Sequence, residues 1–135
     1  MSLSNDWFAE MYEITIKSDF AAAHCLQEIG GKCESLHGHN FTVEVSIESE
    51  TLNELGLVID FRLFKSKTQD VLQTLDHSYL NELPPFQGKN PSSENLAFYI
   101  FQELARRIDQ AAYRLSRVSV WESETSRATY RREEK

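Results

Sequence analysis

The sequence predicts an α+β domain of two layers, in which short antiparallel strands form a sheet and two helices cover one of its faces. Two observations support this fold class. Stretches near both ends of the chain alternate apolar and polar residues, which is the pattern of half-buried strands. The middle of the chain holds two stretches whose apolar residues recur every three or four positions, as in amphipathic helices. The expected order is β-β-α-α-β-β, in a single domain over residues 1–135.

Two strands are expected near the N-terminus, over residues 12–22 and 39–49, because apolar and polar residues alternate in both. The apolar residues of each strand would share one face. Residues 25–36 contain two adjacent glycines and are expected to form a loop. Residues 1–11 are expected to be a frayed or appended N-terminal segment.

Two helices are expected in the middle of the chain. Asp60 is a good N-cap for the first helix, which would run to about Leu75. Residues 78–91 include two adjacent prolines and are expected to form a loop. Pro91-Ser92-Ser93 opens the second helix, whose apolar stripe comprises Leu96, Ile100, Phe101, Leu104 and Ile108.

Two further strands, expected over residues 115–123 and about 127–131, complete the sheet. Because both helices would cover one face, the polar residues of the strands are left on an uncovered face. Exposed sheet edges invite pairing with further strands. Assembly with other copies of the chain is one explanation for this uncovered face.

Charge and hydropathy argue against several kinds of partner. The 135 residues carry a net charge of −7, which argues against binding to nucleic acid or to a membrane surface. No apolar run approaches the ~18 residues of a membrane-spanning helix, and no signal-peptide pattern is present. We therefore expect a cytoplasmic protein. A disulfide between Cys25 and Cys33 is possible, but the reduced form is favoured there.

Three histidines form a candidate metal site. His37 and His39 stand two positions apart, so an extended strand would point both imidazoles to one face. If the alternation of the first strand continues, His24 lies on the same face as the apolar residues of that strand. Imidazole is a preferred ligand of zinc and similar metals, and three ligands without an obvious fourth leave an open position for catalysis. The alternative is three hydrogen-bonded polar residues near strand ends.

Cys33 lies four residues before the histidine pair. A thiol near a divalent cation loses its proton easily and can act as a base or a nucleophile. The alternative is a small buried residue, which fits less well in a polar, glycine-containing loop.

Asp76-His77 is a second acid–imidazole pair that could transfer a proton near neutral pH. The alternative is a helix end, where His77 would meet the negative end of the helix dipole.

Glu122 lies on the same face of its strand as apolar residues, where a carboxylate needs a partner. It could pair with an internal arginine, or it could accept hydrogen bonds from a ligand with adjacent N–H groups.

Together these residues resemble the 6-pyruvoyltetrahydropterin synthase and 6-carboxytetrahydropterin synthase family. The resemblance runs in the family's order from about Phe20 to Tyr130. The matching pieces are Phe20-x-x-x-His24, Cys33-x-x-x-His37-Gly38-His39, Val58-Ile59-Asp60-Phe61, Leu75-Asp76-His77-x-x-Leu80-Asn81, Asn90-Pro91-Ser92-Ser93-Glu94-Asn95 and Val120-Trp121-Glu122.

The resemblance implies the tunnelling fold, in which the antiparallel sheets of several subunits close into a barrel with the helices outside. It implies zinc on His24, His37 and His39, and a homohexamer built as a dimer of trimers with sites at subunit interfaces. It also implies proton abstraction by Cys33, a relay by Asp76 and His77, and a pterin pocket that Glu122 anchors and that Ser93 and Glu94 border.

The three-residue spacer between Cys33 and His37 resembles the queuosine-pathway branch of the family. That branch implies a zinc-dependent lyase that converts 7,8-dihydroneopterin triphosphate to 6-carboxy-5,6,7,8-tetrahydropterin, acetaldehyde and triphosphate. A 6-pyruvoyl product is the alternative within the family. More remote alternatives are a zinc hydrolase, which would not need Cys33, and a zinc-binding module without catalytic activity.

Overall fold

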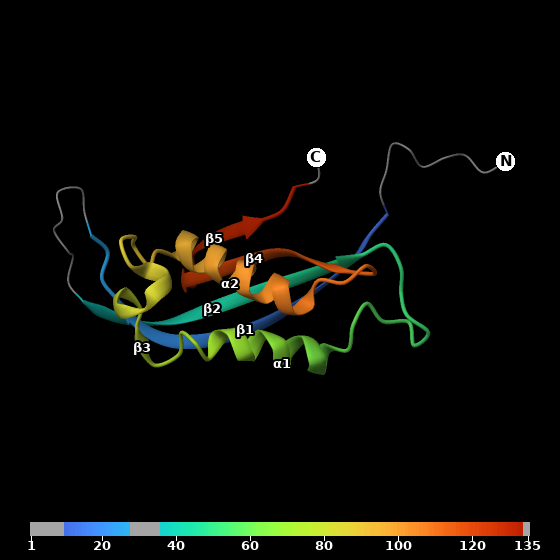
Figure 1. Ribbon diagram of the computed structural model, residues 1–135, viewed down its shortest axis with the longest axis horizontal. Coiled ribbons are helices and arrows are strands. Elements are labelled where there is room, and N and C mark those ends of the chain that lie inside the picture. Colours follow the sequence, from blue (N-terminus) through green and yellow to red (C-terminus); the bar gives the residue numbers. More distant parts are fainter. Residues whose placement is uncertain (1–9, 28–35, 134–135) are drawn as a thin grey trace.

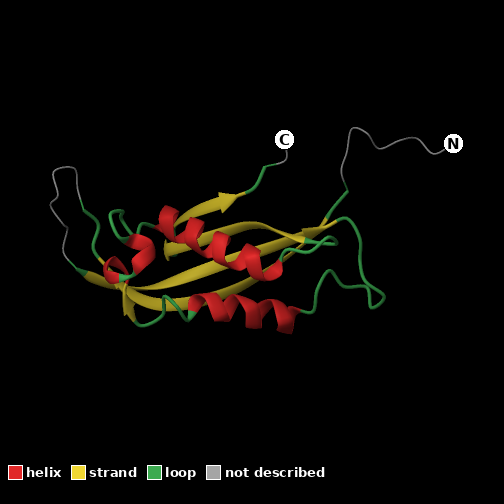
Figure 2. Cartoon of the chain, viewed as in Figure 1, coloured by secondary structure: helices red, strands yellow, loops and turns green. Residues whose placement is uncertain are grey.

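The computed structural model describes residues 10–27 and 36–133. Five strands form one sheet in the order β3-β1-β2-β4-β5, and both helices lie on the same side of it (Figure 1, Figure 2). The elements are β1 (Tyr12–His24), β2 (His37–Ser49), α1 (Phe61–Leu72), β3 (Ser78–Tyr79), the 3₁₀ turns η1 (Leu80–Glu82) and η2 (Pro84–Phe86), α2 (Ser93–Ile108), β4 (Arg114–Ser123) and β5 (Ser126–Arg131).

The long hairpin of β1 and β2 is the centre of the sheet. Its antiparallel register runs without a shift from Tyr12 opposite Ser49 to His24 opposite His37. Because the register is unbroken, the alternation of faces read from the sequence holds along both strands. The β2–β4 ladder shifts register between Ser46 and Ile47.

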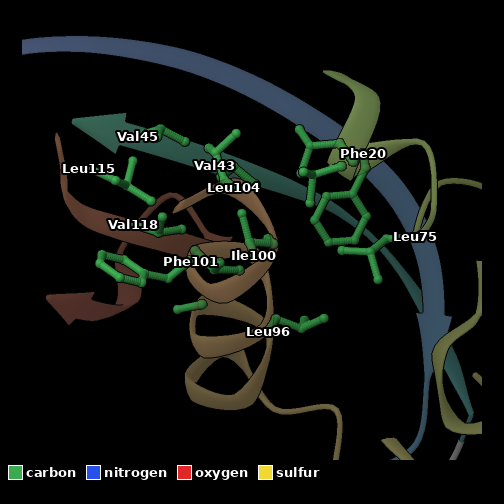
Figure 3. Close-up of a cluster of buried hydrophobic side chains, with 14 of the residues drawn as sticks. Phe20, Val43, Val45, Leu75, Leu96, Ile100, Phe101, Leu104, Leu115 and Val118 are labelled. Atoms are coloured by element: carbon green, nitrogen blue, oxygen red, sulfur yellow. The ribbon is translucent and has the colours of Figure 1, made fainter. Parts of the chain in front are cut away.

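Both helices begin at a side chain that caps them, and for α1 it is the expected Asp60. The Asp60 carboxylate accepts the backbone N–H of Arg62 at the start of α1, and the Ser92 hydroxyl accepts that of Asn95 at the start of α2. The predicted apolar stripe of α2 is buried and faces the sheet, as Leu96, Ile100 and Leu104 do in Figure 3. α2 packs on β4 and β5 while α1 packs on β1, so the predicted two-layer α+β class is confirmed.

The region between the helices differs from the expected loop. Residues 78–91 contain the two 3₁₀ turns and the short strand β3, which pairs in parallel with Ala22 and Ala23 of β1. α1 also ends at Leu72 rather than near Leu75. The chain there tightens, because the Leu75 N–H bonds the Leu72 carbonyl in a 3₁₀-type turn.

The uncovered face of the sheet is polar and its charges are segregated. Strands β1 and β2 present mostly acidic side chains there, and β4 and β5 present basic ones. These residues are Glu13, Lys17, Asp19, Glu44 and Glu48 on the acidic half, and Arg117, Arg127 and Arg131 on the basic half. Among the described residues, two ion pairs cross between the two halves: Arg117 Nη2 to Glu13 at 2.6 Å and Arg114 Nε to Glu48 at 3.3 Å.

The described residues bear on membrane spanning and on the state of one cysteine. Among the described residues, none of the helices is long and apolar enough to span a bilayer. Cys25 is buried and disulfide-bonded, so the expectation of a reduced thiol at this position is wrong.

Candidate metal centre

The three predicted histidines converge where the β1–β2 hairpin meets α2. His24 lies directly across the ladder from His37, and His39 pairs with Ala22 two residues away. The Nε2 atoms of His24 and His37 are 3.0 Å apart, and the ring centroids of His37 and His39 are 4.4 Å apart. The shared parity of the three histidines therefore does place their imidazoles at one point.

Strand β4 adds a carboxylate to this cluster. Glu122 Oε1 lies 3.1 Å from His24 Nε2 and 3.4 Å from His39 Nε2. One donor atom from each of the four residues lies within 4.8 Å of all the others. Three imidazoles and a carboxylate form a donor set that suits zinc or a similar transition metal. The sequence offered no obvious fourth protein ligand, and the structure provides a candidate.

The orientation of His24 is set from outside the cluster. Its side chain is fully buried, and its Nδ1 lies 2.9 Å from the Pro91 carbonyl oxygen. A proton on Nδ1 satisfies that carbonyl and leaves the Nε2 lone pair directed at the cluster. The Phe41 ring packs against the imidazole with centroids 5.3 Å apart, so an apolar wall limits the movement of this side chain.

Asp76 and His77 attach to the outer edge of β1 at Ala21. Asp76 Oδ1 accepts the Ala21 N–H at 2.9 Å, and the His77 N–H donates to the Ala21 carbonyl at 2.6 Å. Asp76 Oδ2 lies 2.8 Å from His77 Nδ1. Two hydrogen bonds hold the pKa of the Asp76 carboxyl below its usual value. The larger contribution comes from the Ala21 N–H and the smaller one from the His77 side chain.

His77 is not at a helix end, because α1 stops five residues earlier. Its backbone has φ +55°, and it is the only non-glycine residue with a positive φ in the described part of the chain. Its side chain is 83% exposed. His77 and His39 line one open cleft of about 550 Å³, together with Asn40 and Tyr79. The structure therefore brings the imidazole of the acid–imidazole pair and one histidine of the cluster to the same cleft.

The remaining predicted substrate residues line a second, smaller cavity beside Glu122. Ser93 and Glu94, in the first turn of α2, line a cavity of about 160 Å³ together with Glu122 and Arg127. Asn40, Tyr79 and Arg127 were not singled out in the sequence. Asn40 and Tyr79 adjoin the motif residues His39 and Leu80, but nothing in the residue pattern shows that they share a cleft.

Cys33 falls in residues 28–35 and lies outside the described part of the chain. Its predicted catalytic role therefore stays a prediction.

The fold and this centre define an α+β protein with a side-chain cluster that can hold a metal ion, and comparison with known proteins gives the family. Residues 13–133 match the 6-pyruvoyl tetrahydropterin synthase family. The chain therefore belongs to this family of lyases, as its motifs indicated.

Three relatives match most of the chain, and two of them have the same enzyme name. One from Archaeoglobus fulgidus, provisionally named 6-carboxy-5,6,7,8-tetrahydropterin synthase, is 40% identical over 119 residues, covering 88% of this chain and 95% of the relative. The 6-carboxy-5,6,7,8-tetrahydropterin synthase of Synechocystis sp. is 36% identical, covering 89% and 93% of the two chains. The dihydroneopterin monophosphate aldolase of Pyrococcus furiosus is 34% identical, covering 81% and 88%.

Solved structures support the same fold. The 6-pyruvoyl tetrahydropterin synthase of Caenorhabditis elegans superposes with a TM-score of 0.80 at 27% identity, covering 92% of this chain and 97% of that one. The predicted tunnelling fold is thus confirmed for the single chain.

Proposed function

We propose that this chain is a zinc-dependent 6-carboxy-5,6,7,8-tetrahydropterin synthase of the queuosine pathway. Its substrate is 7,8-dihydroneopterin triphosphate, and its products are 6-carboxy-5,6,7,8-tetrahydropterin, acetaldehyde and triphosphate. The observation that carries the proposal is the convergence of His24, His37 and His39 beside Glu122, in a chain whose relatives include enzymes of that name.

His24, His37 and His39 hold the metal in this proposal. Zinc held by these residues would polarise the substrate and stabilise negative charge as a C–H proton leaves. Cys33 accepts that proton, and His77 with Asp76 moves a proton on the side of the open cleft. Glu122 accepts hydrogen bonds from the adjacent N–H groups of the pterin, and Ser93 and Glu94 border the pterin pocket.

We further propose that the chain forms a homohexamer, a dimer of trimers, with sites at the subunit interfaces. Among the described residues, no strand pairs with the outer edge of β5, and β3 covers only two residues of β1. One of these edges is basic and the other is mostly acidic, so copies would meet with opposite charges. The exposed His77 lies at the β1 edge, where a neighbouring copy can reach it.

Incubation of the purified, zinc-loaded protein with 7,8-dihydroneopterin triphosphate, followed by mass spectrometry, tests the reaction. A reductant is included, because the proposal needs Cys33 as a thiol. We expect 6-carboxy-5,6,7,8-tetrahydropterin and acetaldehyde. A 6-pyruvoyl product would assign the other branch of the family. Phosphate-ester hydrolysis alone would indicate a zinc hydrolase, and tight zinc binding without turnover would indicate a binding module.

A further inference from the structure

Two asparagine side chains each make a reciprocal pair of hydrogen bonds with the backbone that follows β1. Asn81 Oδ1 accepts the Cys25 N–H at 2.9 Å, and Asn81 Nδ2 donates to the Cys25 carbonyl at 2.7 Å. Asn90 does the same with Gln27, at 2.7 Å and 2.9 Å. Both polar groups of each of these two backbone residues are thus bonded by one side-chain amide.

This arrangement reproduces what a neighbouring strand would supply. In an antiparallel sheet, a hydrogen-bonded pair of residues exchanges two N–H···O bonds. A primary amide carries one acceptor and two donor hydrogens in a rigid plane, so it can make the same exchange from a side chain. The β1–β2 ladder ends at His24 opposite His37, and the backbone beyond it needs other partners.

Both asparagines act close to His24. Cys25, which Asn81 holds, is the next residue after this histidine. Asn90 directly precedes Pro91, whose carbonyl oxygen lies 2.9 Å from His24 Nδ1. Asn95 Nδ2 in turn donates to the Asn90 carbonyl at 2.7 Å, which ties this segment to the first turn of α2.

We propose that Asn81 and Asn90 are positioning residues for the metal ligand His24. Asn81 fixes the backbone on the C-terminal side of the ligand, and Asn90 fixes the segment whose Pro91 carbonyl orients the imidazole. The proposal rests on the metal site of the proposed function. The Asn81 pair is part-buried and the Asn90 pair is exposed, so water competes less with the bonds of Asn81 and its effect is the larger one.

Titration of the metal-free protein with Co²⁺ tests this without any measurement of turnover. The visible spectrum of bound Co²⁺ reports ligand geometry, and the titration gives the affinity. Loss of a group that orients a metal ligand typically weakens metal binding by about 10- to 100-fold. We expect Asn81→Ala to fall in that range with an altered spectrum, and Asn90→Ala to show a smaller loss.

Asn81→Asp separates hydrogen bonding from packing. The aspartate fills the same space and can still accept the Cys25 N–H, but it has no N–H for the Cys25 carbonyl and repels it. We expect this variant to bind Co²⁺ at least as poorly as Asn81→Ala. Wild-type affinity in Asn81→Asp would mean that shape alone matters, which would overturn the proposal.

Asn53 provides a matched control far from the cluster. Its Oδ1 accepts the N–H groups of Leu55 and Leu57 in the connection after β2, beyond the opposite end of the hairpin. Asn53→Ala should lower stability to urea and leave the Co²⁺ affinity and spectrum unchanged. Asn81→Ala behaving like this control would overturn the positioning role. A wild-type chain that binds no Co²⁺ would overturn the metal site itself, and this proposal with it.

Discussion

His77 combines a backbone of positive φ with an exposed imidazole. A left-handed conformation is uncommon for a residue with a Cβ and costs free energy. Here the N–H bond to Ala21 and the contact with Asp76 hold it in place. An unfavourable backbone at an exposed residue that lines a cleft is a reason to look for a function at that residue.

The strain can be measured by comparing two substitutions. His77→Gly and His77→Ala both remove the imidazole, but only glycine adopts φ +55° freely. We expect the Gly variant to unfold in urea with a free energy about 1 kcal/mol higher than the Ala variant. Both should be inactive if His77 transfers a proton. Equal stabilities would show that the backbone is not strained here.

The histidine cluster makes a direct prediction about metal content. His37→Ala or His39→Ala leaves two imidazoles, which bind zinc far more weakly than three. We expect each variant to lose most of its metal on dialysis and most of its activity. Elemental analysis gives the metal content. Full zinc occupancy with wild-type turnover in both variants would contradict the assignment of these ligands.

Glu122 can serve the substrate or the metal, and Glu122→Gln distinguishes the two roles. As a pterin anchor, it would lose a charge-assisted contact worth about 1.5–3 kcal/mol of binding free energy, while zinc content stays unchanged. We expect this result in a fluorescence titration with a pterin and in metal analysis. Loss of zinc with unchanged pterin affinity would make Glu122 the fourth ligand instead.

The sequence predicted that the three histidines would converge because all three lie in strands, where parity decides which way a side chain points. Parity also placed Glu122 on the apolar face, but it could not show that β4 brings the carboxylate to His24. The asparagine contacts with Cys25 and Gln27 could not be predicted either. They depend on the path of residues 78–91, which have no periodic pattern.

At the scale of the elements, α1 shows how one carboxylate can make stability depend on pH. Asp60 caps the helix and also pairs with the Arg62 guanidinium at 2.8 Å. Two hydrogen bonds from Arg62 lower the pKa of the Asp60 carboxyl. The bond from the Arg62 side chain contributes more than the bond from its backbone N–H.

A lowered pKa means that the unfolded chain binds a proton more readily than the folded one. The stabilisation by Asp60 is therefore fully present above the ordinary pKa of about 3.9. It is lost as the pH falls through the lower pKa of the folded state. Asp60→Asn keeps a capping oxygen without the titrating group. We expect urea midpoints measured from pH 5 down to pH 3 to fall more steeply for the wild type than for this variant, and parallel curves would contradict the assignment.

The long elements could be predicted and the short ones could not. Strands β1 and β2 and helix α2 extend over enough residues to repeat a period of two or of three to four. β3 has two residues, which is too few for any alternation, and its pairing with Ala22 and Ala23 depends on where α1 ends. Local sequence could not fix that end, because the 3₁₀-type turns after Leu72 continue the apolar spacing as far as Leu75.

At the scale of the whole molecule, the segregated charges of the polar face lie toward opposite edges of the sheet. A head-to-tail ring would join each basic edge to an acidic one. It would also bring Glu122, at the β4–β5 side of one copy, toward Asp76 and His77, at the β1 edge of the next.

Subunit mixing tests whether a site is shared. Cys33→Ala and His77→Ala should each be nearly inactive alone. If the two groups of a site come from different chains, random co-assembly of equal amounts leaves about a quarter of the sites with both groups intact. We expect activity to return toward that fraction after mixing and refolding. Mixed oligomers confirmed by mass spectrometry but still inactive would place both groups in one chain.

The pairing of His24 with His37 across the hairpin also bears on how the chain folds. A slip of one residue between β1 and β2 turns every side chain of the slipped strand to the opposite face. Such a slip would separate the imidazoles of the two strands. A metal held by both strands adds its binding free energy only to the native register, because no slipped hairpin presents the same ligands. Besides any role in catalysis, the ion would then favour correct strand pairing over misaligned hairpins during folding.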